Sequence, residues 1–501
     1  MTVSGGDSRL QSNVIIGVFH QVLSLLINMV SKYAVRTYLG VEYLGLQTVF
    51  GNFCDIFTFA FMGIGTAMMY SLYRPLALGK RKEQAEIYQY YRRIYRILTV
   101  AVMSIGSAAV FLVLVVVHAD IRVMEITGTY FLYLGSVLIY NRLFLEYYYI
   151  MADQKRYICC LVMSTVDGAA LVFQVFVLKT AYNYSLFLLC VLVKNIITYF
   201  ILHSYIKRRY SYLLQEEGMP GTAEQKEIRK NVKDLIIYRA GNVLVNSTDS
   251  IVISDLLSTA TAGCYSNYMF VSMGIQSMIS SFFDSILAKI GHSVSLDGRD
   301  KQYSDFLKLS AVNIMVNGIT VIGFYWLVQD FISLWMGAEV LLDMKVPAIV
   351  ALNLYLTGIR QTTAAYRQSA GLFQKVGYIV LGKGLLNLVL SYILGAVYGL
   401  MGILTATAVS SVITLYFYEP YMVYRYFGKS WKPEAVYQIV SGGLTYVILR
   451  IVGIPMQAMP AHSWFWLCIK GMLCLLLSLV CFFLFGAVVS KIIKKLGEKQ
   501  L

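Results

Sequence analysis

Fourteen stretches of about 20 mostly apolar residues run through this chain and constrain its fold more than any other feature. A run of this length crosses the hydrocarbon layer of a membrane as one helix. Of the 501 residues, 14% are charged, whereas soluble domains carry about 25% charged residues. We therefore expect an all-α polytopic membrane protein with about 14 transmembrane helices. The runs lie approximately at 14–38, 43–72, 94–117, 127–151, 157–179, 184–206, 234–257, 263–290, 306–328, 346–367, 376–398, 400–424, 433–453 and 464–489.

The connections between these runs alternate in charge. Every second connection holds clusters of Lys and Arg, as in 74–93, 207–233 and the tail after 490. The others hold few cations, namely Arg36, Arg122, Lys179, Lys345 and Arg450. Cytoplasmic loops carry the excess of positive charge, so we expect both termini to be cytoplasmic in a cell (plasma) membrane. The net charge of the chain is +15, but its cations lie in short clusters between apolar runs. Nucleic-acid binding needs cations gathered on one soluble face, so we do not expect nucleic acid as a partner.

The predicted outer loops are too short for an external catalytic domain. The largest covers roughly 329–345, so we expect a protein that is not an enzyme. The five histidines are scattered and the eight cysteines lie inside apolar runs, without the spacing of a metal site. No metal and no cofactor are therefore predicted.

A weak internal repeat has an offset of 218 residues. Tyr43-Leu44-Gly45-Leu46 falls on Thr261-Ala262-Gly263-Cys264, and a charged turn follows a long apolar helix in both copies. The offset spans six helices, so the copies share one orientation and form a parallel repeat. We expect an N-lobe at 1–206, a cytoplasmic linker at 207–233, a C-lobe at 234–424 and, at 425–501, two further helices with a basic tail.

Two equivalent helices carry polar stripes. The stripe on the first span recurs every fourth residue, and the stripe on the seventh recurs at three and four. Ionisable groups inside spans usually face a cavity or the bundle interior. The Ser and Asn side chains could instead bridge helices in a dry bundle, but the first span has no acid to pair with its cations. We therefore predict a hydrated cleft lined by His20, Ser24, Asn28, Lys32 and Arg36 and by Arg239, Asn242, Asn246 and Asp249.

Further charged residues lie within the spans. Arg142 and Arg360 are candidate cavity cations, although Arg142 is also spaced to pair with Glu146, and Arg360 could be an orientation charge near a helix end. Lys194 has a structural alternative as the partner of Asp167. Asp55 and Asp249 either balance the cations or carry a coupling ion. A surplus of Arg suits an anionic cargo, since its planar fork of donors grips phosphate.

Taken together, the two six-helix lobes and two extra helices resemble the multidrug/oligosaccharidyl-lipid/polysaccharide exporter superfamily. Within it the chain is most similar to the bacterial polysaccharide flippases and to their relative, the lipid II flippase. The resemblance is carried by the polar helix at 13–38, by Tyr43-Leu44-Gly45-Leu46 and by Asn246-Ser247-Thr248-Asp249-Ser250.

That resemblance implies a V-shaped central cavity, opened to each side in turn. It implies an undecaprenyl-pyrophosphate-linked oligosaccharide as cargo, membrane lipids as surroundings, and glycosyltransferases and a polymerase of the same pathway as partners. Coupling would use a proton, Na⁺ or the membrane potential. The alternatives are a cation-coupled multidrug exporter of the same superfamily and a polytopic polysaccharide polymerase or ligase.

Overall fold

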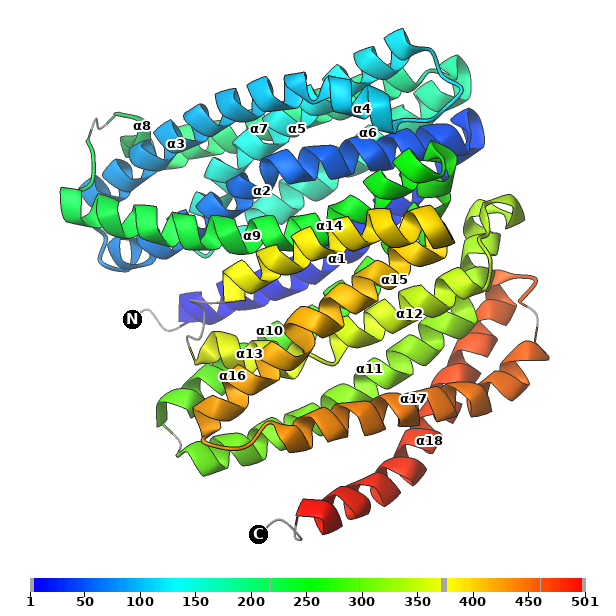
Figure 1. Ribbon diagram of the computed structural model, residues 1–501. Coiled ribbons are helices and arrows are strands. Elements are labelled where there is room, and N and C mark those ends of the chain that lie inside the picture. Colours follow the sequence, from blue (N-terminus) through cyan, green and yellow to red (C-terminus); the bar gives the residue numbers. More distant parts are fainter. Residues whose placement is uncertain (1–3, 216–217, 297, 371–375, 460, 498–501) are drawn as a thin grey trace. The chain divides into compact units, whose positions relative to one another are not determined.

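The protein is built from long helices (Figure 1). The structure, a computed structural model, describes residues 4–215, 218–296, 298–370, 376–459 and 461–497, and within these ranges it contains no strand. Contacts divide the chain into two compact units, Met1–Gly263 and Cys264–Leu501. The prediction of an all-α polytopic fold is confirmed.

The first unit contains nine helices and the start of a tenth within the described ranges. Helix α2 packs along α9 and α5, α5 packs along α7, and α1 lies on α6. The helices are α1 (Ser4–Leu39), α2 (Val41–Ala77), α3 (Arg81–Ala108), α4 (Val110–Val116), α5 (Val123–Ala152), α6 (Arg156–Ala181), α7 (Tyr184–Arg209), α8 (Tyr212–Gln215), α9 (Thr222–Leu256) and α10 (Thr259–Leu296). Helix α9 begins inside the predicted linker and continues into the predicted C-lobe, but its long contact with α2 places it in this unit.

The second unit begins with the rest of α10, from Cys264 onward. In it α14 packs on α15, and α11 packs on α12, α17 and α18. Its further helices are α11 (Arg299–Met336), α12 (Lys345–Gly358), α13 (Gln361–Ser369), α14 (Val376–Tyr398), α15 (Leu400–Ser411), α16 (Phe417–Phe427), α17 (Lys432–Gln457) and α18 (Trp464–Gly497). Two short elements complete it, the 3₁₀ turn η1 (Ala338–Val340) and the π-helical segment η2 (Val412–Tyr416), which joins α15 to α16.

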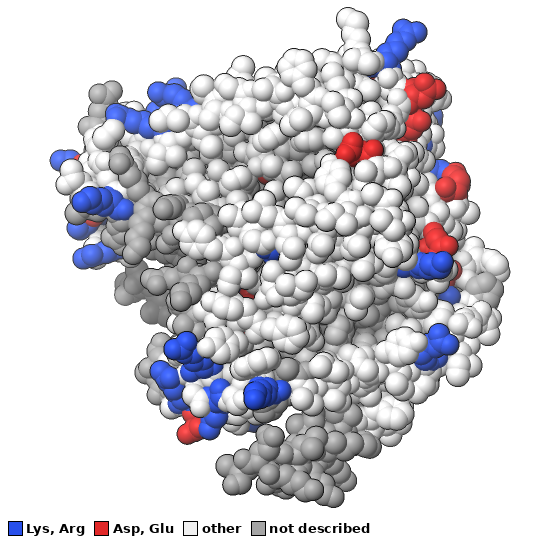
Figure 2. Space-filling view, in the orientation of Figure 1, with Lys and Arg blue, Asp and Glu red and all other residues white. Residues whose placement is uncertain are grey.

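Each of the fourteen predicted apolar runs is helical. The third run is divided at Ala109 into α3 and α4, which are bent by 41°, and the tenth is divided at Ile359–Arg360 into α12 and α13. By length and apolar composition, ten helices of the described ranges could cross a membrane, or eleven if the bent pair counts as one span. On the face shown in Figure 2, most coloured Lys, Arg, Asp and Glu side chains lie toward the two ends of the helices, and the surface between them is mostly uncharged.

Aromatic clusters hold the helices together at the ends that carry the basic loops. In the first unit Tyr88, Tyr91, Tyr95 and Tyr149 are fully buried against α2, α5 and α7. In the second, Phe306 packs edge-to-face on Tyr366 and Tyr424. Edge-to-face pairs of aromatic rings add stabilisation beyond the area they bury.

A hydrogen-bonded network closes the basic end of the first unit. The Tyr210 hydroxyl donates to Asp153 Oδ2 at 2.5 Å, and Lys155 Nζ lies 2.6 Å from the same carboxylate oxygen. The Tyr212 hydroxyl donates to Gln84 Oε1 at 2.6 Å, and Gln84 Nε2 donates to the Pro75 carbonyl at 2.9 Å. Burial and the bond to Asp153 raise the pKa of Tyr210, which lies just beyond α7.

Glycines shape the opposite end of this unit. Gly40 has φ of +100° in the turn between α1 and α2, a region that favours glycine. Five residues later, a Cβ on Gly45 would collide with the carbonyl of Thr259. A Cβ on Gly263 would lie 2.7 Å from the Val41 oxygen and 2.8 Å from the Gly45 nitrogen. The starts of α2 and α10 therefore meet backbone to backbone.

Candidate functional site

The polar stripe of α1 is partly tied to its neighbours and partly open. His20 Nδ1 is hydrogen-bonded to Ser164 Oγ of α6 at 2.8 Å. Asn28 is exposed, and its Nδ2 donates to the carbonyl oxygen of Ser24 at 2.8 Å. The polar stripe therefore anchors α1 to α6 at His20, whereas the side-chain amide of Asn28 is exposed.

Lys32 and Arg36 continue this stripe toward the Gly40 turn. Both are half-buried, and both interact with other groups of the protein. With a rise of about 1.5 Å per residue, Lys32 lies about 12 Å from Gly40 along α1. A hydrocarbon layer is about 30 Å thick, so an ammonium at this depth needs water or polar partners.

Asp55 is exposed in the middle of α2. It lies about 22 Å along the helix from Gly40, and Met62 and Tyr70 are exposed further along the same helix. An ionised carboxylate facing hydrocarbon at this depth would be costly. The uncovered face of α2 at Asp55 is therefore the best candidate for a hydrated surface in the first unit.

The stripe of α9 is more deeply packed. Arg239 and Asn242 are half-buried, whereas Asp249 is buried, with 6% of its surface exposed, and interacts with neighbouring groups. The side chain of Asn246 lies outside the described residues. Of the two acids proposed for coupling, only Asp55 is open to its surroundings.

Arg142 lies in a buried polar cluster of the first unit. Glu146 is fully buried and its Oε1 pairs with His203 Nδ1 of α7 at 3.1 Å, rather than with Arg142 as the spacing predicts. Arg142 Nη1, Glu146 Oε2 and the Tyr88 hydroxyl are buried without hydrogen-bond partners in the described part of the chain. The rotation of α5 about its axis turns Glu146 toward His203 of α7. A spacing rule that compares residues within one helix cannot predict such a contact between helices.

Arg360 makes an ion pair inside the second unit. Its Nη2 lies 2.8 Å from Glu419 Oε2, and the buried Arg367 Nε lies 3.5 Å from the other oxygen of the same carboxylate. The three side chains join the α12–α13 break to α16. In the first unit Lys194 pairs with Asp167 at 2.9 Å, which confirms the structural alternative for this lysine.

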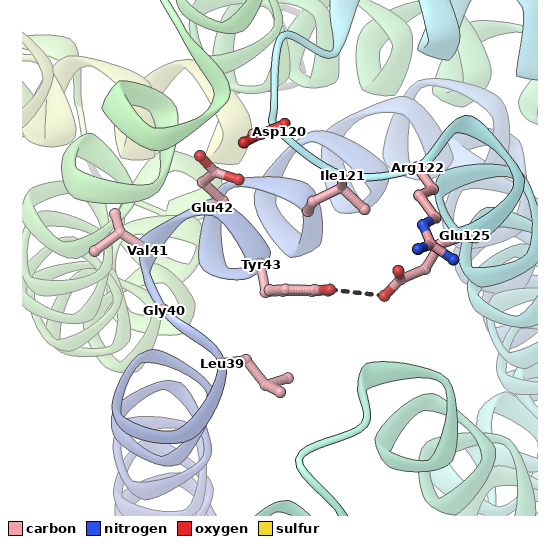
Figure 3. A pocket seen from close by; sticks show the side chains of 9 residues that line it. All are labelled: Leu39, Gly40, Val41, Glu42, Tyr43, Asp120, Ile121, Arg122 and Glu125. Carbon is pink, nitrogen blue, oxygen red and sulfur yellow. Dashed lines mark hydrogen bonds between the residues drawn. The ribbon is translucent and has the colours of Figure 1, made fainter.

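A pocket of about 490 Å³ lies at the Gly40 turn, which sequence reasoning did not single out (Figure 3). Its wall is formed by the start of α2 and by the loop before α5. Tyr43 points to Glu125 and its hydroxyl donates to Oε1 at 2.7 Å. Glu42, Asp120 and Arg122 also line it. Apart from charged residues in a predicted outer loop, no sequence signal marks it. Among the described residues no group of three or more His, Cys, Asp or Glu could hold a metal ion.

Comparison with known proteins supports the fold and not a sequence family. No protein-family profile and no curated protein sequence matches the chain. The chain is similar in structure to the lipid II flippase MurJ in an inward closed conformation, with 14% identity and a TM-score of 0.69, over 95% of this chain and 99% of that one.

Two other solved structures are similar over most of their length. One is a multidrug resistance MATE family transporter of the MOP superfamily, inward-facing, with 14% identity, a TM-score of 0.63, and 80% of this chain and 94% of that one covered. The other is a MOP superfamily transporter from Pyrococcus furiosus whose binding pocket is described as having reverse polarity, with 13% identity, a TM-score of 0.60, and 84% and 96% covered. The chain therefore has the fold of MOP-superfamily transporters, as its resemblance predicts.

Proposed function

We propose that the protein is a flippase that moves a polyprenyl-pyrophosphate-linked oligosaccharide across the cytoplasmic membrane by alternating access. The observation that carries this proposal is the pair Lys32 and Arg36, two half-buried cations on a membrane-spanning helix. A transporter fold with cations at this depth suits a cargo that brings negative charge into the membrane.

The cargo explains why such a site is needed. A pyrophosphate with attached sugars cannot cross hydrocarbon unaided, because its charges and hydroxyls would lose their water. Lys32 and Arg36 would replace that water with charge-assisted hydrogen bonds, and the open amide of Asn28 would contact sugar hydroxyls. The isoprenoid tail could stay in the lipid during the movement.

Alternating access would use the two lobes that the sequence predicts. The lobes 1–206 and 234–424 would move against each other, joined by the linker 207–233, with both termini in the cytoplasm. Arg239 and Asn242 would contribute from α9. Asp55 would carry a coupling proton or Na⁺, because it is an exposed acid in the middle of a membrane-spanning helix. Glycosyltransferases and a polymerase would act before and after this step.

The second candidate is a cation-coupled exporter of drugs. It is favoured by the same open carboxylate, Asp55, which suits a cationic cargo, and by the likeness to a MATE transporter. The surplus of Lys and Arg on the spans favours the flippase over this exporter.

Lipid translocation in proteoliposomes tests the proposal. A fluorescent undecaprenyl-pyrophosphate oligosaccharide is placed in the bilayer, and its movement is followed for wild type, Arg36→Ala, Arg239→Ala and the control Lys179→Ala. Lys179 is an exposed cation at the end of α6. We expect transport by wild type and the control, reduced on the order of tenfold in the other two, since a hydrogen bond to a charged group is lost. Transport that survives in both variants would remove these residues from the site, and no transport by wild type would contradict the function.

A further inference from the structure

A second pocket, of about 670 Å³, lies along the final part of α7. Ile197, Phe200 and Ile201 line one part of it, and Arg208 and Arg209, the first residues of the predicted linker after Lys207, line the other end. The three apolar side chains are strongly exposed, Phe200 at 60%. The pocket thus joins an uncovered apolar wall to two guanidinium groups within one helix.

Helix geometry sets these groups in one line. At about 100° per residue, residues 197, 200, 201, 204 and 208 share one side of α7. The distance from Ile197 to Arg208 is about 16 Å along the axis. This matches the depth of one leaflet, about half of a 30 Å hydrocarbon layer. The pocket therefore has the length of a lipid acyl chain with its headgroup at the arginines.

The two arginines at the end of the pocket have no acidic partner among the residues that the structure describes. In the part of the chain that the structure describes, neither Arg208 nor Arg209 forms an ion pair with a carboxylate, whereas Lys155, at the same end of this unit, is paired with Asp153. The Ser204 and Tyr205 side chains line the pocket between the apolar wall and the arginines. Hydroxyl groups at this level suit the glycerol and ester region of a lipid.

We propose that this pocket binds an anionic phospholipid of the cytoplasmic leaflet. Its phosphodiester would accept hydrogen bonds from Arg208 and Arg209, and one acyl chain would lie on Ile197, Phe200 and Ile201. A zwitterionic lipid brings its own cation to the arginines and binds less tightly. Basic groups close to a membrane surface favour anionic lipids, and two of them give a preference on the order of tenfold. The proposal concerns a resident lipid and is independent of the cargo.

Native mass spectrometry of the full-length protein in detergent tests the proposal. Phosphatidylglycerol and phosphatidylcholine with identical chains are added in equal amounts. Wild type is expected to retain the anionic lipid about tenfold more than the zwitterionic one. The double variant Arg208→Gln/Arg209→Gln is expected to lose this preference, and Arg208→Lys/Arg209→Lys to keep most of it.

The matched control is Lys82→Gln/Arg93→Gln, which removes the same charge from exposed positions on α3 outside the pocket. It should bind lipid as wild type does. Equal retention of both lipids by wild type, or an equal loss in the control, would overturn the proposal. Displacement of phosphatidylglycerol by equimolar undecaprenyl phosphate would also overturn it, because the pocket would then be a port for isoprenoid lipid. Each of these results is independent of whether the protein transports the proposed cargo.

Discussion

Gly45 of α2 and Gly263 of α10 touch through their backbones: a Cβ on Gly263 would lie 2.8 Å from the Gly45 nitrogen and 3.2 Å from its Cα. The 218-residue offset of the internal repeat aligns these same two glycines. Two weakly similar segments thus share a residue type because each helix start needs a surface without a side chain. The glycines that carry part of the repeat are explained by packing.

Gly263→Ala is expected to destabilise the protein by about 1–3 kcal/mol, since the added methyl would press on the backbone of α2, which cannot give way as a side chain can. Thermal melting of the purified protein measures this. Gly168→Ala on α6 is the control, because a Cβ there meets nothing within 4 Å. It should melt at the same or a higher temperature, since Ala is the better helix former. Equal melting of both variants would contradict the close contact.

Asp55→Cys is expected to react with a charged, membrane-impermeant thiol reagent. The residue is exposed, and the depth of a carboxylate there requires water. Alkylation in membranes, in a background with the eight native cysteines replaced, measures this. Val172→Cys on α6 is the comparison, because it is 69% exposed on an apolar helix and should face lipid. Labelling of position 172 and not of position 55 would show that the open face of α2 is dry.

Glu419→Gln is expected to cost about 3–5 kcal/mol of stability, because it leaves Arg360 and the buried Arg367 without their shared carboxylate. Chemical denaturation in detergent measures this. Glu83→Gln is the control, since Glu83 forms an exposed pair with Lys80 at 2.6 Å, worth about 0–1 kcal/mol. If Glu419→Gln were as mild as the control, Arg360 would not depend on this pair and could serve as a cavity cation.

Tyr210→Phe is expected to cost about 1.5–3 kcal/mol at neutral pH, because it removes a hydrogen bond to the Asp153 carboxylate. The pKa of Tyr210 is raised in the folded protein, by burial first and by this bond second. Its stabilisation is therefore complete below the pH where an unfolded tyrosine ionises, about 10, and is lost as the pH rises toward the folded pKa. The difference in melting temperature between wild type and Tyr210→Phe should be constant from pH 6 to about 9 and shrink above it. A difference that vanished at neutral pH would contradict this account.

The apolar runs were enough to predict the helices, because the thickness of a membrane fixes their length and leaves no other way to satisfy the backbone. The partners of the charged residues could not be predicted in the same way. His203 meets Glu146, and Arg360 meets Glu419, across different helices, and these contacts depend on the rotation of each helix about its axis. The pair between Lys194 and Asp167 could be proposed from the sequence, because both residues lie in the middle of consecutive predicted spans.

The break at Ile359–Arg360 and the bend at Ala109 also have no clear sequence signal. Neither contains a proline; Gly358 and the polar stretch 360–363 lie at the first and Gly106-Ser107 precedes the second, but glycines of this kind also occur inside the unbroken helices of this chain. In contrast, the Gly40 turn is readable, since a glycine between two long apolar runs marks a tight connection. The exposure of Asp55 could not be predicted from the sequence, because an acid within an apolar run has the same sequence signal whether its side chain is paired or exposed.

The most direct test of the central claim compares two cargoes in one preparation of proteoliposomes. One is a fluorescent undecaprenyl-pyrophosphate oligosaccharide, and the other is a cationic dye, each measured with and without a membrane potential and a proton or Na⁺ gradient. The flippase account predicts that the lipid-linked sugar crosses the bilayer and that the dye does not, with Lys32→Gln/Arg36→Gln slowing the lipid on the order of tenfold. Export of the dye with no movement of the lipid, abolished by Asp55→Asn, would contradict it and identify a cation exporter.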